Sequence, residues 1–240
     1  MTSQDGDYRT KWLEKMEFLQ HVTDQHDAVI MLFDASAYRF IYMSDRGNIL
    51  GGYTPEDFTS ETGVDFSFHN IHPDHRSAAL VMQIKIITYG MEHTMMRESK
   101  TVANMICQYK KKSGEYIRYL QKFTAVEFDS TGYPLLYLRY GYNISHLVKS
   151  SVALIINSPG EIMVWNYNTN NKILEQANVL TTQEKKILQF LSEGKPSREI
   201  ADLLFLSPHT VDTHRRNLLK KTNCIDSTAM IAFSKMTGLI

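Results

Sequence analysis

The hydrophobic pattern at the start of the chain predicts an amphipathic helix. Residues 8–22 carry apolar side chains spaced by about one helical turn, which gives a helix one apolar face. These side chains are Tyr8, Trp12, Met16 and Leu19. The apolar face must be covered, either by the core of its own domain or by a second copy of the chain.

Between residues 28 and 143 the pattern alternates between strands and helices. Short β-rich runs at 28–33 and 39–43 predict a hairpin, Thr54 predicts the cap of a short helix, and 74–89 predict a long helix. Three further strands are separated by the turn sequences KKKSGE and DSTG: 102–109, 116–128 and 133–143. Strands, a helical middle and a three-stranded meander form an α+β plan.

The C-terminal pattern predicts two short helices joined by a tight turn. Residues 197–204 form the first, and Ser207 is a good N-cap for a second helix that begins with Pro208 and continues to about Thr222. Such a pair is a helix-turn-helix, whose second helix is sized to enter the DNA major groove. On the second helix Val211, Leu218 and Thr222 lie on one face, which is predicted to be buried. A polar, mostly basic face carries His209, Asp212, Thr213, Arg216 and Lys220.

A family resemblance covers residues 180–223. The residues that carry it, in fixed register, are Leu180, Thr181, Glu184, Leu188, Gly194, Glu199, Ile200, Ala201, Leu204, Ser207, Thr210, Val211, His214, Arg215, Leu218 and Lys221. With them the segment resembles the LuxR-type (GerE- or NarL-type) helix-turn-helix domain of bacterial transcription regulators. Thr222 and Asn223 depart from it, since the family usually has Leu then Gly there. The resemblance implies an all-α, four-helix domain whose last helix, about 227–236, often makes the dimer contact.

The resemblance also implies which side chains read DNA. Asp212, Thr213 and Arg216 occupy the positions that reach base edges, where Arg can pair bidentately with guanine. Asp212 repels phosphate, so it either accepts from a cytosine amino group or restrains Arg215 or Arg216. Phosphate contacts are expected from Ser197, Arg198, His209, Thr210, Arg215, Lys220 and Lys221. Arg215 points toward the core by its helical angle, so it can also be a packing residue.

A second resemblance covers residues 26–148. It is carried by Leu50, Gly51, Tyr53, Thr54, Pro55, Glu56, His72, Pro73, Lys112, Ser113, Gly114, Glu115, Asp129, Gly132, Asn143, Ile144 and Ser145. In order and spacing these residues resemble a PAS sensor domain. That resemblance implies a five-stranded antiparallel sheet with helices on one face, enclosing a small pocket. The input left open is a small ligand in that pocket or a protein signal without a ligand.

These observations divide the chain into four segments. Residues 1–25 form the N-terminal amphipathic helix, 26–148 the PAS-like domain, 149–179 an extra hairpin and linker, and 180–240 the helix-turn-helix domain. The extra hairpin, at 151–168 around Pro159 and Gly160, either extends the sheet or docks the two domains together. The polar residues 169–178 are expected to be the linker.

Charge and cysteine usage agree with this division. The 240 residues are 43% hydrophobic and have no net charge, but residues 180–240 carry +3 and the rest −3, which suits phosphate binding at the C-terminal end. Cys107 and Cys224 lack CxxC spacing, so neither a disulfide framework nor a zinc site is indicated. The longest apolar run is Ala28 to Phe33, which is too short to span a membrane. A cytoplasmic location is expected.

Cofactor and enzyme interpretations find little support. His69, His72, His75 and His93 lie in the region where haem-binding PAS domains have a ligand, but no Cys or carboxylate partner is placed for a metal, so no cofactor is predicted. The flavin-binding Asn-Cys-Arg context is absent, as are GxSxG, P-loop, HExxH and GxGxxG motifs. The chain is therefore not expected to be an enzyme.

The sequence predicts a dimeric bacterial transcription regulator that binds double-stranded DNA and senses a signal at its PAS-like domain. Two alternatives stay open. The helix-turn-helix could contact RNA polymerase or another regulator without reading DNA, or the chain could be a haem or flavin redox sensor.

Overall fold

The structure is a computed structural model that describes residues 7–23, 27–92, 101–149, 152–158, 161–168, 170–177 and 180–240. The helices are α1 (Asp7–Thr23), α2 (Pro55–Thr59), α3 (Gly63–His69), α4 (Pro73–Glu92), α5 (Thr182–Ser192), α6 (Ser197–Leu204), α7 (Pro208–Thr222) and α8 (Ser227–Thr237). The strands are β1 (Val29–Asp34), β2 (Arg39–Met43), β3 (Val102–Lys110), β4 (Tyr116–Phe128), β5 (Pro134–Asn143), β6 (Ala153–Ser158), β7 (Glu161–Asn168) and β8 (Ile173–Gln176). Within these ranges no helix combines the length and apolar character needed to cross a bilayer.

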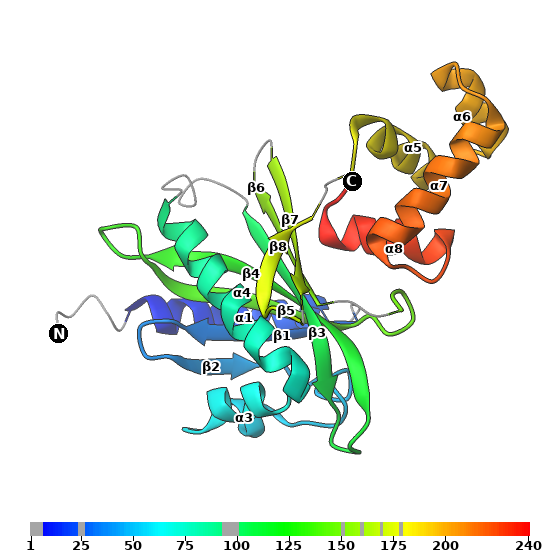
Figure 1. The fold of residues 1–240 in the computed structure, drawn as a ribbon. Helices are drawn as coiled ribbons and strands as arrows, with labels where there is room; N and C mark the ends of the chain where they lie inside the picture. Colours follow the sequence, from blue (N-terminus) through cyan, green and yellow to red (C-terminus); the bar gives the residue numbers. More distant parts are fainter. Residues whose placement is uncertain are drawn as a thin grey trace.

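The strands form one antiparallel sheet in the order β2-β1-β5-β4-β3-β6-β7-β8. The first five strands, with α2, α3 and α4 over one face, are the α+β fold that the PAS resemblance implied (Figure 1). The sheet is larger than the predicted five strands, because β6, β7 and β8 continue it beyond β3.

Part of the predicted linker is a strand. Residues 173–176 were expected to connect the domains, but they form β8 and pair with β7 from Trp165 to Asn168. An exposed strand edge leaves backbone N–H and C=O groups unpaired, and β8 supplies partners for those of β7. Leu174 also packs against the main core, so one of the few apolar residues of this polar stretch drives the docking.

The extra hairpin both extends the sheet and packs against the C-terminal domain, the two roles that its sequence left open. Its first strand, β6, pairs with β3 and so extends the sheet. Its side chains alternate between the two faces, so that Leu154 and Ile156 join the core beneath the helices while Ala153 and Ile155 join a core shared with the C-terminal domain. The predicted turn at Pro159 and Gly160 lies outside the described residues.

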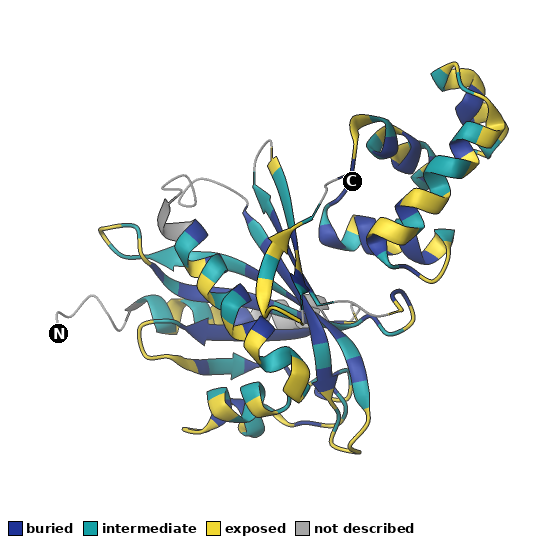
Figure 2. Ribbon diagram, in the orientation of Figure 1, coloured by how far each residue is buried: buried dark blue, intermediate teal, exposed yellow. Residues whose placement is uncertain are grey.

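The two faces of the sheet have different covers. On the face under α2–α4, Met105, Cys107 and Phe123 belong to a large apolar core. On the opposite face, Ile106 and Leu120 pack in one cluster with the helices of the C-terminal domain. Figure 2 shows buried residues concentrated along the strands, as expected for a sheet covered on both sides.

Helix α1 covers the rest of that opposite face. Its buried Met16 packs with Ile30 and Leu138, and Trp12 Nε1 donates to Glu127 Oε2 at 3.1 Å. Tyr8 also packs against this cluster. The sequence left two covers open for this apolar face, its own core or a second copy of the chain. In the structure the face packs against its own core.

A candidate DNA-binding interface

The start of α7 is built by its own sequence. Ser207 Oγ accepts a hydrogen bond from the Thr210 N–H at 3.0 Å, and Pro208 occupies the first helical turn, where a missing N–H leaves no bond unmade. The turn before it is held by the Leu206 N–H, which donates to the Ala201 carbonyl at 2.9 Å. Phe205, at the end of α6, has φ of 54° and is 96% exposed. These contacts fix α7 across α6 as a helix-turn-helix.

The buried face of α7 is the predicted one: Val211, Leu218 and Thr222 are buried. Asn223 takes the left-handed conformation at the C-cap, which Asn tolerates better than most residues. Thr222 Oγ1 donates to the Leu218 carbonyl at 2.9 Å, so the hydroxyl that replaces an apolar side chain is satisfied within the helix. The departure from the family pattern is therefore accommodated locally.

A hydrogen-bond network ties three helices together behind the exposed face. The Ser197 hydroxyl at the start of α6 donates to Asp212 Oδ1 at 2.8 Å. Arg215 Nη1 donates to the same hydroxyl oxygen at 2.8 Å, and Nη2 donates to Ser227 Oγ on α8 at 3.2 Å. Arg215 Nη1 also lies 3.8 Å from Asp212 Oδ1. In this arrangement Asp212 restrains Arg215, and both side chains join α6, α7 and α8.

Arg216 lies one helical turn after Asp212 on the exposed face of α7 and points outward. It is exposed, and its Nη2 donates to Thr213 Oγ1 at 3.0 Å, while the Thr213 hydroxyl donates to the His209 carbonyl at 3.0 Å. Arg198 and His209 are exposed as well. Figure 1 shows α6 at the end of the helical domain that is farthest from the sheet. A basic, accessible face is thus formed by the first half of α7 and the start of α6.

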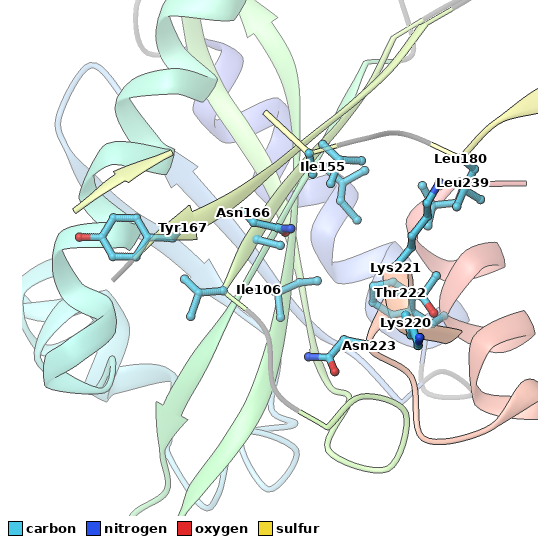
Figure 3. Close-up of a pocket in the computed structure, with 15 residues that line it drawn as sticks. Ile106, Ile155, Asn166, Tyr167, Leu180, Lys220, Lys221, Thr222, Asn223 and Leu239 are labelled. Carbon is cyan, nitrogen blue, oxygen red and sulfur yellow. The ribbon is translucent and has the colours of Figure 1, made fainter. Parts of the chain in front are cut away.

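Lys220 and Lys221 are both exposed and lie at the C-terminal end of α7. Lys221 Nζ forms an ion pair with Glu184 Oε2 on α5 at 2.7 Å, and both lysines line a cavity of about 440 Å³ between the helical domain and the sheet (Figure 3). Burial alone would raise the pKa of Glu184, but hydrogen bonds from Lys221 and Thr181 hold it below its ordinary value. The C-terminal end of α7 therefore faces the sheet.

The last helix also contacts the sheet. The carbonyl of Thr237 accepts from the side-chain amides of Asn104 on β3 and Asn157 on β6, and Lys122 Nζ on β4 donates to the Met236 carbonyl at 2.9 Å. These bonds hold the C-terminal end of α8, and Met230 and Phe233 are buried in the core shared with the sheet.

Sequence reasoning missed three residues of this region. Glu184 was recognised as a family match, but its ion pair joins positions 37 apart in the chain and no local signal announces it. Ser227 on α8 accepts a hydrogen bond from Arg215. The sequence indicated only that Arg215 points toward the core, not which residue it meets there. The exposure of Phe205 could have been suspected from an apolar residue in a two-residue turn.

His69, His72 and His75 have structural partners. His75 Nδ1 accepts the Gln108 N–H at 3.0 Å, and His69 Nδ1 lies 2.7 Å from the Asp65 carbonyl. His72 packs edge-on against Tyr116. His93 lies outside the described residues. Within the ranges described, no three His, Cys, Asp or Glu side chains gather as a metal site would require.

Comparison with known proteins places the C-terminal segment in a family. Residues 178–234 match the family model described as bacterial regulatory proteins, luxR family. Over 58 residues the chain is 43% identical to the regulatory protein SdiA of Escherichia coli (strain K12); this stretch is 24% of each protein, so the chain matches about a quarter of that relative's length.

Two solved structures resemble larger parts of the chain. The N-terminal domain of a diguanylate cyclase with PAS/PAC sensor from Marinobacter aquaeolei is 15% identical, with a TM-score of 0.40 over 49% of this chain and 95% of that one. A Vibrio cholera VqmA–ligand–DNA complex is 15% identical, with a TM-score of 0.34 over 95% of this chain and 88% of that one. Both TM-scores are too low to carry a conclusion about this chain.

Proposed function

We propose that this chain, whose residues 178–234 form a domain of the luxR family of bacterial regulatory proteins, is a transcription regulator that binds double-stranded DNA sequence-specifically. The observation that carries the proposal is the exposed basic face of α7, on which Arg216 is oriented by Thr213. An arginine oriented on the outer face of such a helix suits bidentate pairing with guanine.

The contacts follow from the positions on the two helices. Arg216, Thr213 and Asp212 read base edges, with the Thr methyl available to thymine. Besides its base contact, Asp212 restrains Arg215, to which it is linked through Ser197. Phosphates are bound by Ser197, Arg198, His209, Thr210 and Arg215. Lys220 and Lys221 reach phosphates only after the end of α7 separates from the sheet.

The regulator acts as a homodimer on two half-sites about 34 Å apart, because one helix-turn-helix covers too little DNA for useful specificity. Helix α8 supplies the dimer contact. In the present arrangement its C-terminal end is bonded to Asn104, Asn157 and Lys122 of the sheet. Dimerisation and release from the sheet are therefore coupled.

The sensor controls this release through strands β3 and β4. Met105 and Gln121 line a cavity under the helices, whereas their neighbours Asn104 and Lys122 face the helical domain. If a ligand in the cavity shifts β3 or β4, it also moves Asn104 or Lys122, which bond to α8 on the opposite face of the sheet. A signal that favours one position of these strands biases the equilibrium between sheet-bound and released domain.

The functional domains are residues 26–148 and 180–240, joined by 149–179 and preceded by the helix of 1–25. The protein acts by binding, not by catalysis, and works in the cytoplasm, where bacterial DNA lies. RNA polymerase is a second partner once the regulator sits on DNA.

The proposal is tested by selecting bound sequences from a random DNA pool with the full-length protein at near-physiological salt. We expect an enriched two-fold motif, and Arg216→Ala should abolish its enrichment without altering the circular dichroism spectrum. Lys186→Ala, an exposed lysine on α5, is the matched control. Equal enrichment by Arg216→Ala would disprove the assignment of the base-reading face. A flat salt dependence of binding would instead favour the protein-only alternative.

A further inference from the structure

A buried arginine lies in the sensor domain without an acidic partner. Arg139 on β5 is 8% exposed and points to the face of the sheet under the helices. Its guanidinium carbon lies 4.0 Å from the ring centre of Phe33 and 4.8 Å from that of Phe123. These rings hold the guanidinium plane, but they accept none of its N–H groups in an ordinary hydrogen bond.

The absence of an anion beside Arg139 is unusual in this protein. Among the described residues no carboxylate lies within 4.0 Å of it, and its buried Nε has no hydrogen-bond acceptor. The two buried carboxylates are both paired: Asp34 with Arg9, and Glu184 with Lys221. A buried charge without a partner is costly, so a missing anion is the simplest completion of this site.

Arg139 lines a cavity that can hold such an anion. The cavity has about 230 Å³, and its other walls include Phe40, Phe68, Ile71 and Tyr119. A dry apolar cavity of about 150 Å³ is enough for benzene, so this space admits a single ring with a short substituent.

The entrance of the cavity is defined by exposed lining residues. Tyr38 is 63% exposed and Leu80 49% exposed. Asp65, which is also exposed, is the one carboxylate among the described lining residues, and it makes no ion pair with Arg139. A ligand anion therefore enters past a solvated carboxylate and meets the uncompensated guanidinium inside.

We propose that this cavity binds a small organic carboxylate with a flat apolar body, held by Arg139. The planar guanidinium offers parallel N–H donors that match a carboxylate in a bidentate pair. The rings of Phe33 and Phe40 and the side chain of Ile71 contact the body of the ligand. Gln121 offers a neutral hydrogen-bonding group for a polar substituent.

The charge state of the site fits this assignment. Burial lowers the pKa of Arg139 to about 10, which leaves the guanidinium charged at neutral pH. A carboxylate is ionised there too, so binding is expected to be constant between about pH 6 and 8.

As the signal of the sensor, this ligand rests on the proposed function, because it would act on DNA binding through β3 and β4. Binding itself is measured without DNA, however. A protein that binds the carboxylate but no DNA would contradict the proposed function alone, and a protein that binds DNA but no carboxylate would contradict this inference alone.

The test is calorimetric titration of the full-length protein with benzoate, phenylacetate and hexanoate, and with the matched neutral amides benzamide, phenylacetamide and hexanamide. We expect at least one carboxylate to bind about tenfold or more tightly than its own amide, the factor that a hydrogen-bonded charge pair supplies. Equal affinity for acid and amide, or binding of neither by the folded protein, would overturn the inference.

Variants separate a ligand site from a packing role. Arg139→Met keeps the apolar contacts, so the ligand-free variant should melt no lower than the unmutated protein while its carboxylate affinity falls to that for the amide. Arg139→Lys should keep the preference for the acid but bind it more weakly, because the bidentate pair is lost. Arg39→Met, at an exposed site on β2, is the control. Unchanged carboxylate affinity in Arg139→Met would refute the site.

Discussion

The Lys221 ammonium on α7 lies 2.7 Å from a carboxylate oxygen of Glu184 on α5, and the same carboxylate accepts the Thr181 N–H at 2.7 Å. One buried side chain thus closes the cap of its own helix and holds the end of the helix that we assign to DNA. This double role makes Glu184 a sensitive point of the helical domain.

Replacing Glu184 by Gln should lower the free energy of unfolding by about 2 kcal/mol, because Lys221 loses its counter-charge and the cap loses a charged acceptor. Urea denaturation followed by circular dichroism measures this change. Glu199→Gln, which breaks the exposed Lys195–Glu199 pair, should change it by less than about 0.5 kcal/mol. If both variants change the free energy of unfolding equally, the buried pair stabilises the protein no more than the exposed pair does.

The same pair should make stability depend on pH in the acid range. The pKa of Glu184 is lowered in the folded protein, so its contribution is present above the unfolded-state value of 4.5 and is lost as the pH falls below it. The free energy of unfolding should therefore fall less between pH 7 and pH 3 in Glu184→Gln than in the unmutated protein, and the two values should converge in acid. Parallel acid titrations of the two proteins would check this, and an unchanged pH dependence would contradict it.

His75, on α4, should add a second, milder pH dependence of stability. Burial lowers its pKa, and its unprotonated Nδ1 accepts the Gln108 N–H. Because the folded pKa lies below the unfolded value of 6.5, stability is full above that pH and declines as acid protonates the ring. His75→Gln should flatten the melting temperature between pH 7 and pH 5, whereas His69→Gln, at an exposed ring, should not.

Phe205 should be replaceable with a gain in stability. It adopts a left-handed φ of 54° and is 96% exposed, so it carries backbone strain without burying its ring. Phe205→Asn should raise the free energy of unfolding by roughly 0.5–1 kcal/mol, since Asn tolerates this conformation better. A loss of thermal stability in Phe205→Asn would contradict the assignment of backbone strain to this residue.

Arg198 and Arg216 should affect DNA binding in different ways. Arg198→Ala removes a phosphate contact, so it should weaken binding equally on all sequences and reduce the log–log salt slope by about 1. Arg216→Ala should cost about 1–3 kcal/mol on the selected motif and little on random DNA. Titrations of both variants at several salt concentrations distinguish the two patterns. Identical salt slopes and identical specificity would contradict the division of roles.

Lys122 allows a test of the contact between the sheet and α8. Lys122→Met removes the bond to the Met236 carbonyl, so the helical domain should leave the sheet more readily and bind DNA roughly fivefold more tightly. Residues 180–240 alone contain no strand of the sheet and serve as the reference for a fully released domain. An affinity of the variant below that of the unmutated chain would contradict the coupling.

Short-range signals in the sequence were enough to determine the helix-turn-helix and most strands. Ser207 and Pro208 begin α7 because the cap and the first turn lie within three residues. The turn sequences KKKSGE and DSTG separated the runs that form β3, β4 and β5. The buried face of α7 followed from helical periodicity alone. Each of these features depends on neighbours in the chain.

What only the tertiary structure decided depends on partners far apart in the chain. β8 forms because the edge of β7 offers unpaired backbone groups, although its own sequence is polar. Lys221 pairs with Glu184 of another helix, and Asn104 meets Thr237 across 133 positions. Arg139, a single charge within an apolar strand, acquires its meaning only from the aromatic rings and the cavity that the folded sheet places around it.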